Sequence, residues 1–310
     1  MTEDWTDAVD DHGIVVRRDA VLDRRPHEIG NAAARGRLVA LQRGLYVPAP
    51  VSVTARRRAA AAVLVLRPTA AVASHSTAAR VHGIPVPEED GVEHVTVARA
   101  SRRPHHARLR IHTGRLGPVD VIDTEGVAVT APGRTIVDLV RVLDRYDSAW
   151  ALDQALHTRS VTTDAVLEAA TRLARAQGVA AVRGIVAAAE PRSGSWLETR
   201  ARTVLLDAGL PRPHAQVPVV TSAGTRYVDL GYPDVRIGIE IDGRGSHDTP
   251  DAVYADRHRQ NAVQLRGWTL LRFTWFDVVR RPEWVVDCVR RALAAASAGS
   301  DASSSRVTST

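Results

Sequence analysis

The segment VRIGIEIDGRGSHD, residues 235–248, constrains the fold more than any other part of this chain. Apolar residues alternate with other types at its start, which predicts a β-strand with one face in a hydrophobic core; the apolar positions are Val235, Ile237, Ile239 and Ile241. Glu240 and Asp242 then share the opposite face. Two carboxylates on one strand face are either solvated surface or a place to hold a metal ion.

A second strand is predicted just before it, in TRYVDLG at residues 225–231, and the intervening GYPD is typical of a turn. If the two strands pair, Asp229 joins Glu240 and Asp242 on one side of the sheet. Three carboxylates that close repel one another unless a cation neutralises them. A hard divalent ion with oxygen ligands, Mg²⁺ or Mn²⁺, would resolve the conflict.

Glu198 and His247 are further candidates for the same site. Ser195 and Glu198 have the spacing of a capping box, so Glu198 either caps a helix alone or also serves the site. His247 follows a glycine-rich turn and is a general base, a ligand or a loop histidine without a role. The glycines of GRGSH lack the lysine and the spacing of a phosphate-binding loop. The pair His105-His106 lacks the ligand spacing of a zinc site.

Composition narrows the class of protein. The 310 residues, 45% of them hydrophobic, are enough for two or three globular domains. A single cysteine, Cys288, excludes an internal disulfide framework. The longest apolar run, Ala59–Leu66, is eight residues, and the first residues are acidic rather than signal-like. We therefore expect a soluble cytoplasmic protein with no membrane partner.

The formal net charge of +6 is carried by arginine, because the chain contains no lysine. Residues 51–120 hold 11 arginines and 5 acidic residues. A concentrated basic segment is suited to a polyanion such as nucleic acid. The alternative is a solvated arginine-rich surface that reflects a coding bias, and the missing lysine makes that alternative serious.

Residues 1–50 are expected to form short helices followed by a hairpin in RLVALQRGLYVPAP, turning at Arg43-Gly44. This is the order of a winged helix-turn-helix, in which the last helix enters the major groove and the hairpin touches the DNA backbone. We assign DNA contacts to Arg17, Arg18, Arg35, Arg37, Arg43 and Arg257.

The rest of the chain is predicted to be α/β. In residues 51–190, the patterns indicate helices at 55–66, 71–85 and 131–143, and strands at 93–99, 107–114 and 119–130. A boundary follows at Pro191, and residues 191–295 alternate helices with strands in a compact α/β domain. The polar tail at 296–310 is expected to be disordered.

At this point two resemblances can be named. The ordered residues SWLETRARTVLLDAGL, RYVDLGYPDVRIGIEIDGRGSH and DRHRQNAVQLRGWTLLRFTW resemble the endonuclease-like domain family related to very-short-patch-repair endonucleases, in the PD-(D/E)XK superfamily. This resemblance covers about residues 193–295. It implies a restriction-endonuclease-like domain with Asp229 and Glu240 as metal ligands, Glu198 nearby and His247 beside the reacting phosphate.

GRLVALQRGLYVP, with ASHSTAARVHGIP after it, is similar to the antitoxin of type IV abortive-infection toxin–antitoxin systems. That similarity covers roughly residues 5–185 and is convincing over the first 85. It implies a winged-helix DNA-binding domain followed by an α/β antitoxin-like domain.

The chain departs from the nuclease pattern at one position. The superfamily motif usually ends in a lysine two residues after its acidic residue, where this chain has Asp242. That lysine helps to orient the attacking water and to stabilise the transition state. His247, Arg257 or Gln260 would have to replace it.

Three hypotheses follow. The first is a metal-dependent DNA endonuclease with a DNA-binding head, in phage defence or DNA repair. The second is a DNA-binding regulator or antitoxin whose nuclease-like domain is catalytically silent. The third is a purely structural partner of a neighbouring toxin.

Overall fold

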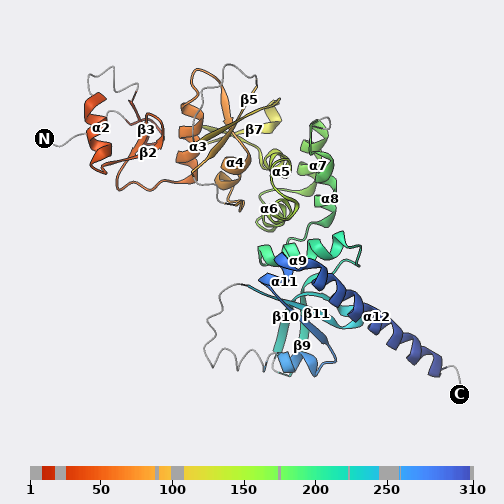
Figure 1. Ribbon diagram of the computed structural model, residues 1–310. Helices are drawn as coiled ribbons and strands as arrows, with labels where there is room; N and C mark the ends of the chain where they lie inside the picture. Colours follow the sequence, from red (N-terminus) through yellow and green to blue (C-terminus); the bar gives the residue numbers. More distant parts are fainter. Residues whose placement is uncertain are drawn as a thin grey trace. The chain divides into compact units, whose positions relative to one another are not determined.

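The computed structural model describes residues 9–17, 26–87, 91–98, 108–173, 176–222, 224–243, 258 and 260–307. It is an α/β protein with three separate sheets (Figure 1). The chain forms two compact units. The N-terminal unit comprises residues 1–144 and 158–186, and the C-terminal unit comprises residues 145–157 and 187–310.

A small three-stranded sheet opens the N-terminal unit. Its order is β1-β3-β2, and the elements are β1 (Val15–Val16), α2 (Pro26–Ala34), β2 (Leu38–Gln42) and β3 (Leu45–Pro48). Ile29 and Ala32 of α2 pack on Val15 and Leu38. Residues 10–13 form a turn rather than part of the helix expected near the N-terminus. The strands of the expected hairpin are confirmed, and they turn at Arg43-Gly44, where Gly44 has a φ of +81°.

A five-stranded mixed sheet follows, in the order β6-β5-β4-β8-β7. The strands are β4 (Ala71–Ala73), β5 (Glu93–Val97), β6 (Leu109–Thr113), β7 (Val121–Thr124) and β8 (Val127–Thr130). The helices of this region are α3 (Ala55–Leu64), α4 (His75–Val81), α5 (Pro132–Val140), α7 (Thr163–Arg172) and α8 (Ala180–Ala188). The helix expected over 71–85 is therefore a strand followed by a short helix.

Helix α3 joins the two sheets of the N-terminal unit. Its alanines Ala59, Ala60 and Ala61 pack in one core with Leu45 and Val47 of the small sheet, and the same core contains residues of β4 and β8. Small side chains allow a helix to approach a neighbour closely on more than one side. The expected domain boundary after residue 50 thus lies within a continuous core.

The C-terminal unit is built on a four-stranded sheet in the order β12-β11-β10-β9. The strands β9 and β10 are antiparallel, as are β10 and β11, whereas β11 and β12 are parallel. A parallel neighbour requires a crossover, which residues 243–268 supply. The strands are β9 (His214–Thr221), β10 (Gly224–Tyr232), β11 (Ile237–Asp242) and β12 (Thr269–Thr274).

The helices that accompany this sheet include α6 (Arg145–His157), α9 (Trp196–Asp207), α11 (Trp275–Arg280) and α12 (Pro282–Val307). Leu205 of α9 and Val285 of α12 are fully buried in one core with Leu230 and Ile239. Helix α6 comes from within the segment that the sequence assigns to the middle domain. Helix α12 continues through Val307, so the expectation of a disordered tail is wrong over 296–307; the alanines that lead into this stretch favour helix.

Candidate active site

The ladder of the C-terminal sheet brings polar side chains from neighbouring strands into one row. Leu230 pairs with Ile239, and the next residue toward the start of β10, Asp229, accepts a hydrogen bond from the N–H of Ile241, the residue after Glu240. Glu240 in turn pairs with Arg272 of β12. The row therefore runs across three strands.

Strand β10 is distorted where Asp229 lies. Val228 packs with Val263 and Leu270, whereas Leu230 packs in the core with α9 and α12. A regular strand would place Val228 and Leu230 on one face. In the neighbouring strand β9, Val217 pairs with Val228 and Ala215 pairs with Leu230. Gln216 lies between them and has a φ of +51°, which is uncommon for a residue other than glycine. The local distortion explains the difference.

Asp229 is surrounded by other carboxylates. Burial raises the pKa of Asp229 to about 6, the backbone N–H of Ile241 opposes this by donating to it, and Glu198, Glu240 and Asp242 raise it further. The N–H of Ile241 lies 2.8 Å from Oδ2 of Asp229. Three of the carboxylates that the sequence singled out are thus close enough to act on the fourth, Asp229.

Glu198 does more than cap helix α9. Its backbone N–H donates to Ser195 Oγ, as in a capping box, but its own carboxylate accepts from the N–H of Gly194 at 2.8 Å and from Gln216 Nε2 at 3.1 Å. A Cβ on Gly194 would lie 3.2 Å from Glu198 Oε1, so a glycine suits this approach. Buried Glu198 therefore faces the sheet and connects α9 to β9.

Arg272 contacts both acidic residues of β11. Its guanidinium lies 3.5 Å from Glu240 Oε2 and 3.0 Å from Asp242 Oδ1. One arginine reaching both carboxylates confirms that Glu240 and Asp242 share a face. Neither Arg272 nor Gln216 was predicted from the sequence. Each is a polar residue between two apolar ones in a strand, a pattern that indicates a polar strand face but not the residues that this face meets.

The carboxylates of this cluster are of the type that could hold a hard divalent cation, but in the described part of the chain they do not form a group of three ligand atoms within 4.8 Å of one another. Asp229, Glu240 and Asp242 offer carboxylate oxygens, the ligand type that Mg²⁺ and Mn²⁺ prefer. The mutual repulsion that raises the pKa of Asp229 is also the interaction that a bound cation would relieve. His247 and Arg257, assigned to the same site from the sequence, lie outside the described residues.

The arginines assigned to DNA binding fall into two groups. Arg43 is at the tip of the β2–β3 hairpin, and Arg17 is beside it, with its N–H donating to the carbonyl of Gly44. Arg35 and Arg37 lie at the other end of the hairpin, and all four side chains are exposed. Arg18 lies outside the described residues.

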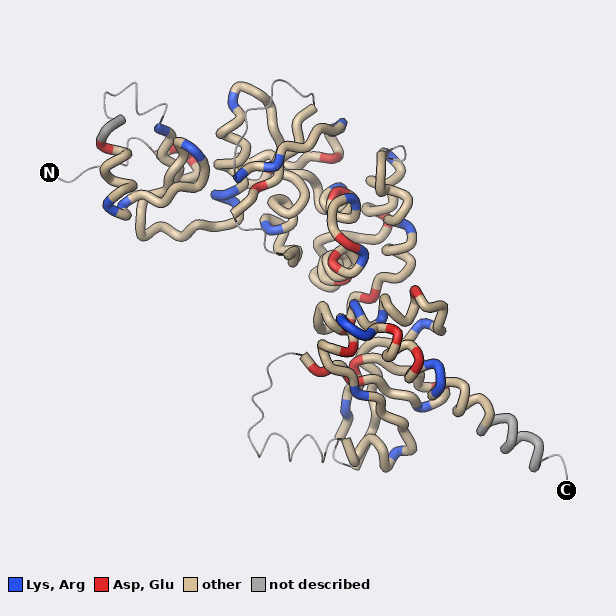
Figure 2. Tube along the Cα trace, viewed as in Figure 1, with Lys and Arg blue, Asp and Glu red and all other residues tan. Residues whose placement is uncertain are grey.

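Several arginines of the basic segment are used within the fold. Arg57 donates to the carbonyls of His12 and Ser52, Arg56 pairs with Glu125, and Arg80 pairs with the buried Glu93. Figure 2 shows the basic positions spread over many elements rather than gathered on one. The charge of residues 51–120 is therefore a weaker argument for nucleic acid than the sequence suggested.

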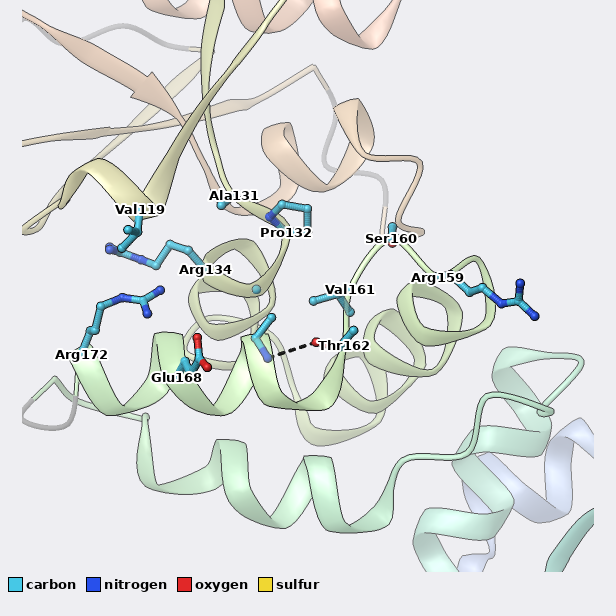
Figure 3. Close-up of a pocket in the computed structure, with 12 residues that line it drawn as sticks. Val119, Ala131, Pro132, Arg134, Arg159, Ser160, Val161, Thr162, Glu168 and Arg172 are labelled. Atoms are coloured by element: carbon cyan, nitrogen blue, oxygen red, sulfur yellow. Dashed lines mark hydrogen bonds between the residues drawn. The ribbon is translucent and has the colours of Figure 1, made fainter.

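A pocket of about 420 Å³ lies in the N-terminal unit, between α5 and α7 (Figure 3). Arg134 and Arg172 line it, and both bond to Asp120. Arg134 also pairs with Asp138. The two guanidinium groups thus have partners within the protein, and the pocket is not part of the carboxylate cluster.

Comparisons with known proteins give relatives but no activity. No family model matches the chain. Uncharacterized protein MT2308 and uncharacterized protein Rv2248, from two strains of Mycobacterium tuberculosis, are each 31% identical to it over 177 residues. The match covers 57% of this chain and 61% of each relative.

Among solved structures, the crystal structure of the Rv2827c protein from Mycobacterium tuberculosis is similar over 57% of this chain and 76% of that one. The TM-score is 0.35 and the sequence identity is 14%. In the part of the chain that the structure describes, no helix has the length and apolar character needed to cross a membrane.

Proposed function

We propose that the C-terminal unit hydrolyses phosphodiester bonds of DNA with the help of a divalent metal ion. One observation carries this proposal: Asp229 is a largely buried carboxylate whose pKa is raised to about 6, first by burial and then by the nearby carboxylates Glu198 of α9 and Glu240 and Asp242 of β11. Groups with perturbed pKa values concentrate at functional sites. Along the chain, the C-terminal unit has a helix, three antiparallel strands, a crossover and a strand parallel to the third. This order also suits the restriction-endonuclease-like architecture that the sequence resembles.

The roles divide among few residues. Asp229 and Glu240 would hold Mg²⁺ or Mn²⁺, which when bound polarises the scissile phosphate and lowers the pKa of the attacking water. Glu198 and Gln216 position the site from α9 and β9. Arg272 holds Glu240 and Asp242 and places a positive charge beside them. That charge takes the place of the missing motif lysine in offsetting charge on the phosphate.

The N-terminal winged helix would hold the substrate. Arg17 and Arg43 at the hairpin tip, with Arg35 and Arg37 at its base, are exposed and spaced along one hairpin. Exposed arginines on a hairpin suit contacts to backbone phosphates, which position a protein on DNA without reading its sequence.

A DNA-binding regulator or antitoxin with a silent nuclease-like unit is the second candidate. Arg272 favours it, because this arginine already neutralises part of the charge of Glu240 and Asp242 from within the protein. The absence of lysine favours it too. A partner toxin belongs to this second proposal.

Incubation of the full chain with supercoiled plasmid tests the first proposal, in Mg²⁺, in Mn²⁺ and in chelator. Glu240→Gln removes a proposed metal ligand, and Glu283→Gln, an exposed residue of α12, is the matched control. We expect metal-dependent nicking by the wild type and by Glu283→Gln, and none by Glu240→Gln. A wild type that retards DNA in a gel but never cuts it would instead support the regulator.

A further inference from the structure

Three histidines meet in the N-terminal unit, in a part of the fold that the proposed function does not use. His75 is the first residue of α4, His94 lies in β5 and His112 lies in β6. Strands β5 and β6 are parallel neighbours, and His112 pairs with Thr96, two residues from His94 and on the same face. The N–H of Ser74, just before His75, donates to the carbonyl of His94. The sheet therefore fixes all three positions.

The ring nitrogens of these histidines converge. One ligand nitrogen from each lies within 4.8 Å of those of the other two. His94 Nδ1 and His112 Nε2 are 3.1 Å apart, and the rings of His75 and His112 are stacked with centroids 3.6 Å apart. Imidazole nitrogens that bind a tetrahedral zinc ion at 2.0–2.1 Å are about 3.4 Å from one another. Small rotations of the side chains would bring the three nitrogens to that spacing.

The surroundings hold the cluster in place. His75 and His94 are 2% and 1% exposed, and His112 is half-buried. His75 Nδ1 lies 3.0 Å from Ser74 Oγ, and Ser74 Oγ accepts a hydrogen bond of 2.8 Å from Thr96. A partner on one ring nitrogen fixes the tautomer and orientation with which the other nitrogen binds a metal. Ser74 thereby leaves Nε2 of His75 for an ion.

The arginines near the three histidines do not prevent a metal ion from binding there. Arg134 and Arg141 act electrostatically on His75. Both, however, are paired with the fully buried Asp138, and Arg134 is also paired with Asp120. Asp138 and Asp120 thus offset part of this positive charge, although Asp120 is shared with Arg172, and the cluster itself consists of ligands that bind as neutral groups.

We propose that His75, His94 and His112 bind a zinc ion. Imidazole suits zinc among the common biological metals, and a site with three protein ligands leaves one tetrahedral position for water or another ligand. The half-buried His112 marks the side from which that ligand would enter. This site lies in the N-terminal unit and has no residue in common with the carboxylate cluster, so the two proposals stand independently.

Titration of the metal-free full chain with Co²⁺ tests the proposal, because tetrahedral Co²⁺ gives a strong visible absorption. We expect one tetrahedral Co²⁺ per chain, as counted from this absorption, its displacement by one equivalent of Zn²⁺, and loss of the absorption in His112→Gln. Ser74→Ala keeps all three ligands and should weaken the affinity about 10–100-fold. If His112→Gln fails to fold, the affinity of Ser74→Ala for Co²⁺ still tests the proposal, because an unchanged affinity would contradict it.

Two controls identify the site. His214→Gln changes an exposed histidine of the C-terminal unit, and His105→Gln/His106→Gln removes the adjacent pair that lies outside the described residues. Both should bind Co²⁺ as the wild type does, and so should Glu240→Gln. Equal binding by the wild type, His112→Gln and Ser74→Ala would overturn the proposal. Loss of binding only in the His105/His106 variant would also overturn it.

Discussion

Asp229 is the residue at which the stability of the fold and the proposed chemistry have opposite requirements. Its carboxylate is largely buried and faces Glu198, Glu240 and Asp242, while the backbone N–H of Ile241 is the contact that favours its charge. At pH 7 the group is mostly ionised against these unfavourable surroundings. A protein tolerates such an arrangement where function requires it.

Asp229→Asn should therefore stabilise the protein at neutral pH. The pKa of Asp229 is raised from 3.8 to about 6, so the folded state binds a proton more tightly than the unfolded state, and stability falls as pH rises between these values. Above pH 6 the full penalty applies, at most about 3 kcal/mol at 1.36 kcal/mol per pKa unit. Asparagine can still accept from Ile241. Thermal unfolding at pH 7 and pH 4 measures the effect.

We expect a higher Tm for Asp229→Asn at pH 7 and almost no difference at pH 4, where little of the penalty has developed. Asp234→Asn, an exposed aspartate beside the same strands, is the matched control and should leave Tm unchanged at both pH values. Equal effects of Asp229→Asn at the two pH values would contradict the prediction.

At this scale the sequence predicted which carboxylates meet but not what holds them. Alternation along a strand was enough to place Glu240 and Asp242 together, and the turn after Gly231 brought Asp229 to them. The contacts of Gln216 and Arg272 with these carboxylates depend on the order of strands in the sheet and on a local backbone distortion. Neither can be predicted from the periodicity of a single strand. The histidine cluster was missed for the same reason, since its members are 18 or more residues apart and meet only through the β4–β5–β6 pairing.

Among the elements, helices α6 and α9 are joined by a buried ion pair. Asp153 accepts from Arg202 at 2.6 Å, from the hydroxyl of Thr199 at 2.7 Å and from the N–H of Glu190 at 2.7 Å. Asp153 and Arg202 are both fully buried. Burial raises the pKa of Asp153, and Arg202 opposes this by favouring the ionised form. These contacts place α6 in the C-terminal unit.

Asp153→Ala should lower the free energy of unfolding by about 3–5 kcal/mol, because it leaves the buried Arg202 guanidinium without its counter-charge. The pair Arg145–Asp207 joins the same two helices at the surface, with both side chains 39% exposed. Asp207→Ala should therefore cost only about 0–1 kcal/mol. Urea unfolding followed by tryptophan fluorescence compares the two, and equal losses would refute the distinction between buried and exposed pairs.

Secondary structure was predictable where patterns were long. The sequence predicts strands at 215–220, 225–231 and 268–275 and a helix at 196–208, and β9, β10, β12 and α9 lie within two residues of these bounds. Strand β11 begins at Ile237 rather than Val235, because Pro233–Val235 form a 3-10 turn and Arg236 adopts a φ of +52°. Strand β4 was missed, since three residues of AVA are too short to show a period of two and are good helix formers by composition.

For the whole molecule, the proposed DNA-binding head makes a quantitative prediction. Replacing Arg17 and Arg43 at the hairpin tip with glutamine should weaken binding of all duplex sequences alike. The slope of log K against log salt concentration should become shallower by about 2, roughly 0.9 for each phosphate that an arginine no longer neutralises.

The matched control for this measurement is Arg183→Gln, an exposed arginine of α8 in the same unit. It should leave both the affinity and the salt slope unchanged. Fluorescence anisotropy with a labelled duplex over a range of salt concentrations measures both quantities. A double variant that keeps the wild-type slope would remove the hairpin tip from the DNA contact.

The sequence predicted where the C-terminal strands and helices begin, but it did not predict that residues 145–157 belong to the same unit. Composition changes at Pro191, and a boundary drawn there separates Asp153 from Arg202. Nothing in the local pattern of residues 145–157 shows that this helix belongs with strands made later, because the reason is a set of contacts between distant positions, with the buried pair of Asp153 and Arg202 among them.

The discontinuous C-terminal unit has a consequence for synthesis on the ribosome. Helix α6 is complete at His157, but its partner α9 begins only at Trp196. At about 5–20 residues per second, α6 waits roughly 2–8 s for that partner. During this interval the buried face of α6, with Leu152 and Asp153, has no native neighbour from α9. A nascent chain stalled between these two helices would therefore present an unpaired helix to chaperones, whereas one stalled after residue 207 would not.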